Sequence, residues 1–471
     1  MSNWFKRNSI TISKLAGCFF ALLSCTPLFA DNDLITKQLN LLEDNFKTLS
    51  AEFYQISSRL PEQRLITIDD IDQLHAEVDR LINNQQAVTA IQLLYLNIDT
   101  VKANLEHNAV LIFTELLLEN NEWSFANSLF RGVEDEGDRS LIAAMQFIFA
   151  KYHAERLQWS QVNKLLNDVA EQLSAESAAY AYLLKGTALQ HLKKHRLAIK
   201  SYKKIPDDSQ YYGYAQLNIA IAEFRQGWWT DAQTTINDLV KNGDKNNNEL
   251  INRLYLVLGY TLLHKEYYRD ARDAFRHVEL GSRYTNRALL GIGLTATNQG
   301  DFVGALNALS ILKDKKTFDL SIDESYLLIP YIYEELQQEV TVTASYAEAM
   351  AYYQQRINNL ENISNQHPDF VNTHYNKKTA SLIIEDNSLD YGKRYPESFI
   401  KNYQLLIDYL SATNDLKLKL RIEALITKHE AVFQEIIGDL LKQRQEYLKS
   451  YLNQSRYGLA RLYDKSNEAA D

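Results

Sequence analysis

Glycine, proline and cysteine are scarce in this sequence of 471 residues, which contains 16 Gly, 6 Pro and 2 Cys. So few chain breakers argue against a fold of many short strands joined by tight turns. Leu, Ala, Glu, Lys and Gln, which all favour helix, are abundant. With 46% apolar residues, the chain lies far from the composition of disordered proteins. The composition therefore predicts an all-α protein.

The first 30 residues have the features of a secretory signal peptide. Lys6, Arg7 and Lys14 give a positive start, and residues 15–24 form an apolar run too short to span a bilayer comfortably. Ala30 supplies the small residue that precedes a cleavage site, and an acidic segment follows it. We therefore expect an exported protein from which residues 1–30 are removed.

Cleavage after Ala30 would leave a mature chain without cysteine, because Cys18 and Cys25 both precede it. No disulfide, thiol chemistry or thiolate metal site is then expected. One alternative is a lipoprotein signal with Cys25 as the lipidated residue, although apolar residues rather than a polar tether follow it. Another is an uncleaved anchor.

The chain is acidic, with 50 Lys and Arg against 60 Asp and Glu, a net charge of −10. Removal of three basic residues with the signal would shift this value to −13, that is 47 minus 60. Such a chain is a poor candidate for binding nucleic acid or anionic lipid. No run after the signal approaches the length of a membrane-spanning helix.

A short pattern recurs at nearly constant spacing. In most copies an aromatic residue or histidine stands three positions before a small apolar residue, as in Trp123–Ala126 and Tyr268–Ala271. The intervals between successive small residues are 36, 36, 36, 34, 39 and 34, and the longest contains the polar segment 241–248, as expected for a loop insertion. These small residues are Ala90, Ala126, Val162, Ala198, Ala232, Ala271 and Ala305.

The pattern resembles the tetratricopeptide repeat, a helix–turn–helix unit with a period of 34 residues. The copies at Ala198, Ala232, Ala271 and Ala305 are strong, whereas the first three are degenerate and most copies lack the terminal proline of the family. The best copy has Tyr255, Leu258, Gly259, Leu262, Tyr268, Ala271 and Phe275 at the family positions. The resemblance implies an all-α solenoid of about seven or eight repeats over residues 69–365.

The last of these repeats is expected to be irregular. It would carry Tyr326, Ile329 and Tyr333 on its first helix, with Pro330 at the small-residue position, and a longer turn before its second helix. The expected residues of that second helix are Tyr346, Ala349 and Tyr353.

Small residues are expected wherever the two helices of a repeat approach closely. A glycine on the first helix would face an alanine on the second, and flanking aromatic rings would fill the wider gaps. A helix glycine costs about 0.5–1 kcal/mol relative to alanine, so its recurrence at one register indicates packing. The residues assigned to this role are Gly186, Ala198, Ala232, Gly259, Ala271, Gly293 and Ala305.

Helical segments flank the predicted array. Residues 31–68 contain an amphipathic helix, interpreted as a cap over the first repeat or, alternatively, as a short coiled coil. Residues 366–471 form the C-terminal helical segment, with a loop at 386–396 and long helices from Glu397. These helices could form a hairpin that caps the last repeat, a coiled coil, or a docking site for a partner. Their apolar stripe comprises Leu418, Ile422, Leu425, His429, Val432, Ile436 and Leu440, extended by Tyr447, Tyr451 and Tyr457.

No catalytic constellation, metal site or cofactor motif is recognisable. His191 and His195 have the i, i+4 spacing of metal ligands, but the neighbouring lysines and arginine would repel a cation. Gly291 and Gly293 lie within a predicted repeat helix and indicate packing rather than a phosphate-binding loop. We therefore expect no catalytic residues, no cofactor and no metal.

By family resemblance, a partner would bind in a groove lined by the first helices. The residues at the groove positions are aromatic or basic, a set that favours an acidic or C-terminal peptide. The alternative is that the aromatic residues only pack between neighbouring first helices. The predicted groove residues are Tyr180, Gln190, Tyr214, Phe224, Arg225, Arg253, Tyr260, His264, Arg287, Asn298 and Tyr331.

These observations favour a periplasmic scaffold or adaptor that binds other proteins, in envelope assembly, secretion, polysaccharide export or division. A structural outer-membrane lipoprotein anchored through Cys25 is the first alternative, and an accessory of a murein-cleaving enzyme is the second. Homo-oligomerisation through the terminal helices is possible in each case.

Overall fold

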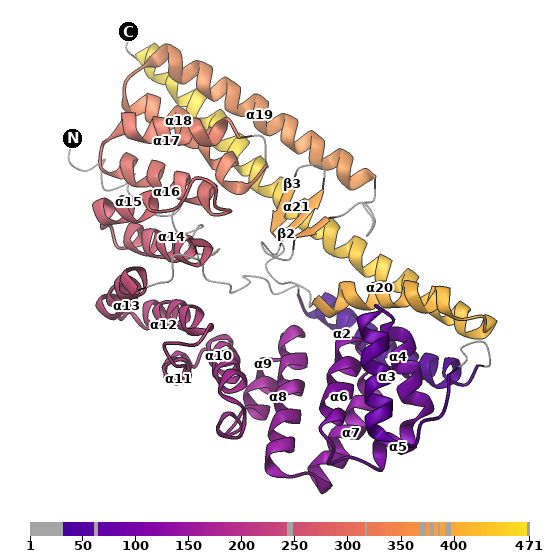
Figure 1. The fold of residues 1–471 in the computed structure, drawn as a ribbon. Helices are drawn as coiled ribbons and strands as arrows, with labels where there is room; N and C mark the ends of the chain where they lie inside the picture. Colours follow the sequence, from indigo (N-terminus) through magenta and orange to yellow (C-terminus); the bar gives the residue numbers. More distant parts are fainter. Residues whose placement is uncertain are drawn as a thin grey trace. The chain divides into compact units, whose positions relative to one another are not determined.

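The structure is a computed structural model that describes residues 32–60, 65–242, 248–315, 318–366, 374–376, 381–384, 387–390 and 397–468. The predicted signal and Cys25 lie outside these residues. Within them the chain is all-α apart from one small sheet, as predicted (Figure 1). Two compact units are present, and each is described by itself. The first unit contains residues 31–235 and 395–432, and the second contains residues 236–394 and 433–471.

The first unit contains the N-terminal helix, five helical hairpins and the start of the C-terminal segment. Its helices are α2 (Asn32–Ser57), α3 (Ile71–Asn83), α4 (Ala87–Leu96), α5 (Ile98–Lys102), α6 (Ala109–Glu119), α7 (Trp123–Glu136), α8 (Arg139–Glu155), α9 (Trp159–Leu165), the 3₁₀ turn η2 (Ala170–Gln172), α10 (Ala175–His191), α11 (His195–Tyr202), α12 (Tyr212–Gln226), the first half of α13 (Trp229–Asn242) and α20 (Glu397–Ala412).

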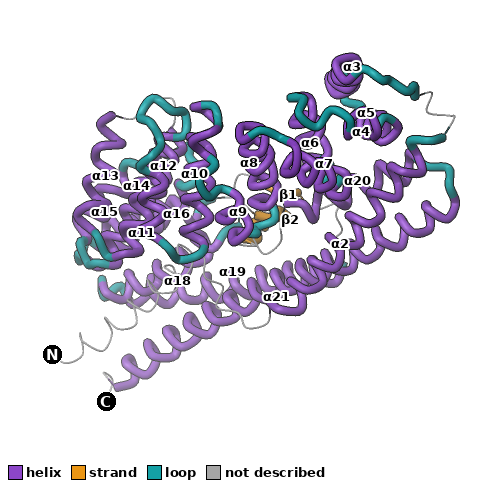
Figure 2. Tube along the Cα trace, turned by 90° about the horizontal axis from the view of Figure 1, so that it is seen from below, coloured by secondary structure: helices purple, strands orange, loops and turns teal. Residues whose placement is uncertain are grey.

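The second unit contains three further hairpins, a small sheet and most of the last helix. Its elements are α14 (Asn248–His264), α15 (Tyr268–Arg276), α16 (Thr285–Asn298), α17 (Phe302–Lys313), α18 (Leu320–Glu335), α19 (Glu339–Asn365), β1 (His374–Asn376), β2 (Ser381–Ile384) and β3 (Asn387–Asp390). Helix α21 (Leu416–Glu468) begins in the first unit and ends in the second. Helices α14, α15 and α16 pack side by side in chain order (Figure 1 and Figure 2).

One turn geometry recurs in all eight hairpins of the described chain. The residue two positions before each second helix has a positive φ, between 54° and 76°. The N–H of the next residue bonds the carbonyl five positions earlier, as in Asp301 to Ala296 at 2.9 Å, which caps the first helix. Only two of these left-handed residues are glycines. The eight left-handed turn residues are Gln85, Asn121, Leu157, Lys193, Gly227, Glu266, Gly300 and Gln337.

The second helix starts at the predicted place in the first seven hairpins. In each, the residue three before the small anchor residue is the first residue of the helix, as in Trp123 of α7 and Tyr268 of α15. The three copies with degenerate sequence therefore form the same turn as the strong ones. The positive φ and the backbone hydrogen bond across five positions, rather than side-chain identity, are the features that all copies share.

The glycines of the repeat lie beneath large side chains of the second helix. A Cβ on Gly259 of α14 would come within 2.5 Å of the Phe275 ring, and a Cβ on Gly291 of α16 would meet the same ring at 2.5 Å. The Phe275 ring thus lies between two successive first helices. Gly186 is placed in the same way under Tyr202, and Gly293 under Leu309. The closest partner is therefore the residue four after the alanine, and not the alanine that the sequence suggested.

The alanines of this set are fully buried beside those contacts. Ala198, Ala232, Ala271 and Ala305 each have 0% exposure. In the second unit Ala271 and Ala305 belong to one apolar core with Phe275 and Leu309, which runs from α14 to α18.

Replacing Gly259 with leucine is expected to destabilise the second unit by about 1–3 kcal/mol, because the new side chain must displace the Phe275 ring. Gly438 of α21 is the matched control, since a Cβ there would meet nothing within 4 Å. Gly438→Ala should instead stabilise by up to about 1 kcal/mol through helix propensity. Denaturant unfolding of the full chain measures both changes, and equal effects of the two substitutions would contradict the packing account.

The last hairpin differs from the expectation. Its turn is as short as the others, and α19 begins at Glu339, so Val342 and not Ala349 takes the anchor position. Tyr346 then takes the place of Phe275, and Pro330 lies inside α18. The prediction of a longer turn was wrong because Glu339 and Val342 lack the aromatic and small residues of the pattern.

Helix α21 covers the end of the repeats in the second unit. A Cβ on its Gly458 would press against the Tyr346 ring, as a Cβ on Gly291 of α16 would press against the Phe275 ring. The Tyr451 ring lies 5.7 Å from the Tyr353 ring of α19. Figures 1 and 2 both place the second half of α21 beside α19. It therefore occupies the position of a next first helix and caps the last repeat. The predicted capping hairpin is only partly correct, because α20 packs against α2 of the first unit.

The stripe predicted for α21 is buried from Leu418 to Leu440, including His429 at 1% exposure. Its predicted extension is only partly correct. Tyr451 is buried, but Tyr447 and Tyr457 are 43% and 70% exposed. Leu448 and Leu452 are buried on this part of the helix instead, at 0% and 5% exposure.

Helix α2 of the first unit packs against α4, α7 and α20, which is the capping alternative for residues 31–68. Phe46, Phe53 and Tyr54 are completely buried in this contact, and the Tyr409 ring of α20 stacks 4.1 Å from Phe53. The aromatic cluster therefore joins the two ends of the unit's sequence.

The three short strands form an antiparallel sheet in the order β1–β2–β3, with Leu382 opposite Tyr375 and Leu389. The sequence predicted a loop at 386–396, so the prediction is wrong for β3. Strands this short carry no periodicity long enough to recognise.

Candidate functional site

The predicted groove residues fall into registers that repeat along the first helices. Tyr180, Tyr214, Arg253 and Arg287 each stand 18 positions before the anchor alanine, on α10, α12, α14 and α16. Arg225, His264 and Asn298 each stand seven positions before it. Each helix therefore presents the same two positions on the same face.

In the second unit this face is basic and partly exposed. Arg253 and His264 of α14 are exposed, and Arg287 of α16 is partly exposed one repeat further on. The amide of Asn298 bonds the Leu294 carbonyl at 2.8 Å and so caps its own helix. Arg253, His264 and Arg287 are the side chains here that a partner could contact.

Tyr260 belongs to the core rather than to this face. It is 4% exposed, and its hydroxyl donates to the Arg287 carbonyl of the next first helix at 2.7 Å. Its ring packs edge-on against Phe275 at 4.8 Å. Burial raises the pKa of this phenol well above its ordinary value. The packing alternative therefore describes Tyr260 better than the groove assignment does.

Tyr331 of α18 lies near the contact between α18 and α21. It is partly exposed, and burial followed by the nearby Glu335 carboxylate raises its pKa. Arg461 of α21 pairs with Glu334 next to it. The position equivalent to an open groove is thus approached by the chain's own last helix.

In the first unit the same face is aromatic. Tyr214 is 45% exposed, and Arg225 is exposed at the end of α12. Tyr180 stacks on Tyr211 with ring centroids 5.0 Å apart, and Phe224 is partly buried. Gln190 is buried and donates to the Asn218 carbonyl at 2.7 Å. Tyr214 and Arg225 remain the accessible members.

A cluster of buried charged groups, which the sequence did not predict, lies where α18, α19 and α21 meet. Asp323 has 0% exposure and forms an ion pair with Arg444 of α21. Its carboxylate also accepts the Tyr352 hydroxyl at 2.6 Å, and its backbone carbonyl accepts the Tyr353 hydroxyl at 2.7 Å. The neighbouring Glu324 accepts the Tyr451 hydroxyl at 3.2 Å.

Burial dominates the electrostatics of this cluster. It raises the pKa of Asp323 despite the attraction of Arg444, and it raises the pKa of Glu324 to about 8. Both carboxyl groups face other protein side chains, and both are nearly inaccessible to solvent. The cluster therefore fixes α21 on the last hairpin and does not present an acid–base pair to a substrate.

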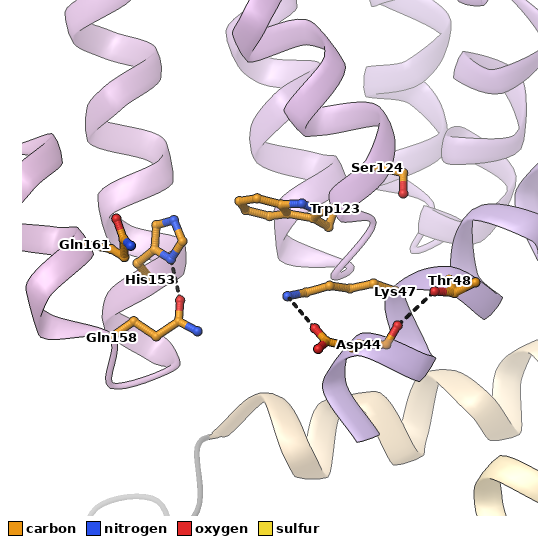
Figure 3. Close-up of a pocket in the computed structure, with 8 residues that line it drawn as sticks. All are labelled: Asp44, Lys47, Thr48, Trp123, Ser124, His153, Gln158 and Gln161. Carbon is orange, nitrogen blue, oxygen red and sulfur yellow. Dashed lines mark hydrogen bonds and ion pairs between the residues drawn. The ribbon is translucent and has the colours of Figure 1, made fainter. Parts of the chain in front are cut away.

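An open pocket of about 640 Å³ lies in the first unit (Figure 3). Its walls come from α2, α7, α8 and the start of α9, which are distant in sequence, so no sequence motif marks it. Its lining includes Asp44, Lys47, Trp123, His153, Gln158 and Gln161.

The described residues contain no cluster of three or more His, Cys, Asp or Glu side chains with the geometry of a metal site. His191 stacks on Trp159 at 4.2 Å instead, and burial, with a smaller effect of Arg225, lowers the pKa of His195. Across the same described ranges, no helix is both long and apolar enough to cross a membrane.

No protein-family model and no curated protein matches the chain. Among solved structures it is similar to the apo form of RapI, at 14% identity and a TM-score of 0.43, over 76% of this chain and 99% of that one. It is also similar to the TPR domain of P58(IPK), at 14% identity and a TM-score of 0.21, over 67% and 92% of the two chains. The Cut9–Hcn1 hetero-tetramer of APC/C matches at 10% identity and a TM-score of 0.28, over 84% and 96%.

The fold class is therefore defined by features of this chain alone. The repeat period, the shared turn and the ring packed between successive first helices define an all-α helical repeat fold whose hairpins resemble tetratricopeptide units.

Proposed function

We propose that the protein is an exported, non-catalytic scaffold that binds a partner protein through the first-helix face. The observation that carries this proposal is the recurrence of accessible aromatic and basic side chains at one register of the first helices, with Tyr214 in the first unit and Arg253 and Arg287 in the second. Aromatic and arginine side chains are the commonest anchors of protein interfaces.

The charge of this face suggests the chemistry of the partner. Arg253 and Arg287 stand one repeat apart in a chain of net charge −10, and His264 lies at the other end of α14. An acidic segment or a C-terminal carboxylate would pair with these groups, and binding would weaken as salt is added.

The proposed compartment is the periplasm, on the basis of the signal features in residues 1–30. There the protein would act in envelope assembly, secretion, polysaccharide export or division. The alternative of an outer-membrane lipoprotein anchored through Cys25 predicts a globomycin-sensitive mobility shift, which Cys25→Ser would abolish. A role beside a murein-cleaving enzyme is a weaker alternative, which murein-cleaving activity in the purified protein would revive.

The double variant Arg253→Ala/Arg287→Ala is expected to lose its partner. If each arginine is an interface anchor, affinity should fall by about tenfold per residue. The Tyr260 contact with α16 is retained, because it uses the Arg287 backbone carbonyl. In-cell crosslinking followed by affinity purification of the full chain measures the yield of the partner.

The matched control is Arg269→Ala/Arg276→Ala on α15, which removes the same charge from exposed positions on a second helix. The pairing of Arg276 with Asp273 is solvent-exposed, so its loss should barely affect stability. A partner that is retained by the first variant, or lost equally from both, contradicts binding at the first-helix face.

A further inference from the structure

The pocket of the first unit has the size of a small-molecule site. Its volume of about 640 Å³ falls within the range of ligand pockets. Helix α2 supplies one wall, and the α7 start and the turn between α8 and α9 supply the others (Figure 3). It exists because the capping helix crosses the second and third hairpins.

Trp123 provides the aromatic surface of the pocket. Its ring stacks on Tyr152 at 5.1 Å and meets Phe149 edge-on at 5.4 Å, so two aromatic side chains of α8 fix its orientation. Trp159, at the equivalent position one repeat later, has its ring covered by His191 in a parallel stack at 4.2 Å. His153 instead meets Trp123 edge-on, at 69°, which leaves the imidazole edge facing the pocket (Figure 3).

Carboxamides and a neutral imidazole line the opposite side. His153 Nδ1 and Gln158 Oε1 share a hydrogen bond of 2.5 Å, which leaves the Gln158 amide hydrogens and the far ring nitrogen available to a ligand. Burial lowers the pKa of His153, with Arg156 and Lys47 adding to the effect. Gln161 adds a second exposed carboxamide.

The charges in the pocket balance one another. Lys47 Nζ lies 3.7 Å from Glu43, 4.0 Å from Asp44 and 5.2 Å from the centre of the Trp123 ring. Glu43 is already occupied by Arg156 and Asn402, each at 2.8 Å. An anionic ligand would therefore meet the Asp44 carboxylate beside the Lys47 ammonium group, and a cation would meet Lys47 itself.

The residues behind the pocket walls are buried and paired with one another. Arg156 has a side chain that is 3% exposed, bonds Glu43 and Asn121, and lies 3.3 Å over the Tyr152 ring. This network fixes α2 against α7 and α8, and with them the two main walls of the pocket. Preorganised walls are what a ligand site requires.

We propose that this pocket binds a neutral sugar unit of a glycan. The aliphatic C–H face of a pyranose ring packs on an indole, which here requires the Lys47 ammonium over the Trp123 ring to turn towards the sugar hydroxyl groups. Those hydroxyl groups match a wall of amides, imidazole, carboxylate and ammonium that has donors and acceptors but no net charge.

Titration of the full chain with two neutral trisaccharides, maltotriose and tri-N-acetylchitotriose, tests this assignment by ligand-observed NMR and calorimetry. At least one is expected to bind, and Trp123→Ala or Gln158→Ala/Gln161→Ala should weaken binding at least tenfold. The glutamines are exposed, so their double variant tests the site without disturbing the core. Trp228→Ala is the matched control, because Trp228 is 36% exposed in the same unit and contacts Arg196 instead.

Three results would overturn the assignment. The first is absence of binding of both sugars at millimolar concentration, and the second is equal loss of binding in Trp228→Ala. The third is a pocket that takes acidic peptides in preference to sugars, with the same dependence on Trp123. Neither the Arg253/Arg287 variant nor its partner enters this test, so it stands or falls apart from the proposed function.

Discussion

Replacing Arg444 with alanine is expected to lower the free energy of unfolding of the second unit by about 3–5 kcal/mol. Asp323 is completely buried, and the Arg444 side chain, 10% exposed, is its ion-pair partner. Without it the carboxyl group keeps the Tyr352 hydroxyl as a donor, at 2.6 Å, and the weaker attraction of the Arg356 guanidinium. A buried carboxylate that loses its cation must either remain charged at high cost or bind a proton.

Two further variants separate this effect from simple truncation of a side chain. Asp323→Asn/Arg444→Met removes both charges and keeps an acceptor for Tyr352, so it should cost less than Arg444→Ala alone. Arg456→Ala, at an exposed position on the same helix, should change stability by no more than about 0.5 kcal/mol. Denaturant unfolding, with hydrogen exchange of α18 and α21, provides the measurement. An Arg444→Ala variant as stable as Arg456→Ala would refute the account.

The free energy of unfolding of the second unit is expected to decrease as pH rises from about 5 to 8, because of Glu324. Burial raises the pKa of this carboxyl to about 8 in the folded protein, against 4.5 for the unperturbed group. Between these values the folded state holds a proton that the unfolded state has released. The stability contribution is therefore fully present at acidic pH and falls by up to about 1.4 kcal/mol per pH unit until pH passes 8.

Glu324→Gln removes this dependence, because glutamine keeps the acceptor for Tyr451 and does not titrate. Melting temperatures at pH 5, 6, 7 and 8 should be similar for the variant and the parent at pH 5, and the variant should be increasingly more stable towards pH 8. Glu361→Gln, an exposed substitution on α19, should follow the parent at every pH. Parallel curves for the parent and Glu324→Gln would show that Glu324 ionises normally.

The array could be predicted from the sequence because its signal is local and repeated. Trp123, Tyr268 and Phe302 each start a second helix where the pattern places them, and the α21 stripe from Leu418 to Leu440 is buried as expected. These features depend on residues three or four positions apart, which the helix itself brings together.

The departures arise where tertiary contacts decide. Leu157 and Lys193 adopt positive φ without being glycine, because the capping bond of each turn and the packing of both helices hold them there. In the last hairpin Val342 takes the anchor position and Glu339, not an aromatic residue, stands three positions before it. The register of this hairpin could therefore not be recognised from the sequence. Tyr260 has a groove position in the sequence, but its hydroxyl donates to the Arg287 carbonyl of the next first helix. No sequence pattern predicts this contact.

The candidate site was predictable only in part. Arg253 and Arg287 could be placed by their register, and they lie on equivalent faces of α14 and α16. The pairing of Asp323 with Arg444 joins residues 121 positions apart, and the pocket joins Lys47 to Trp123 and Gln158. No spacing rule relates such residues, because the capping helices that bring them together belong to the ends of the sequence.

Site-specific photocrosslinking in cells tests the central claim most directly. A photoreactive phenylalanine analogue would replace Arg253 or Arg287 on the first-helix face, Arg269 on a second helix, and Tyr457 on the exposed side of α21. The account predicts that one partner protein is crosslinked from positions 253 and 287 and not from 269 or 457. Crosslinks from 269 or 457 alone would contradict it, and would assign partner binding to the second helices or to the terminal helix.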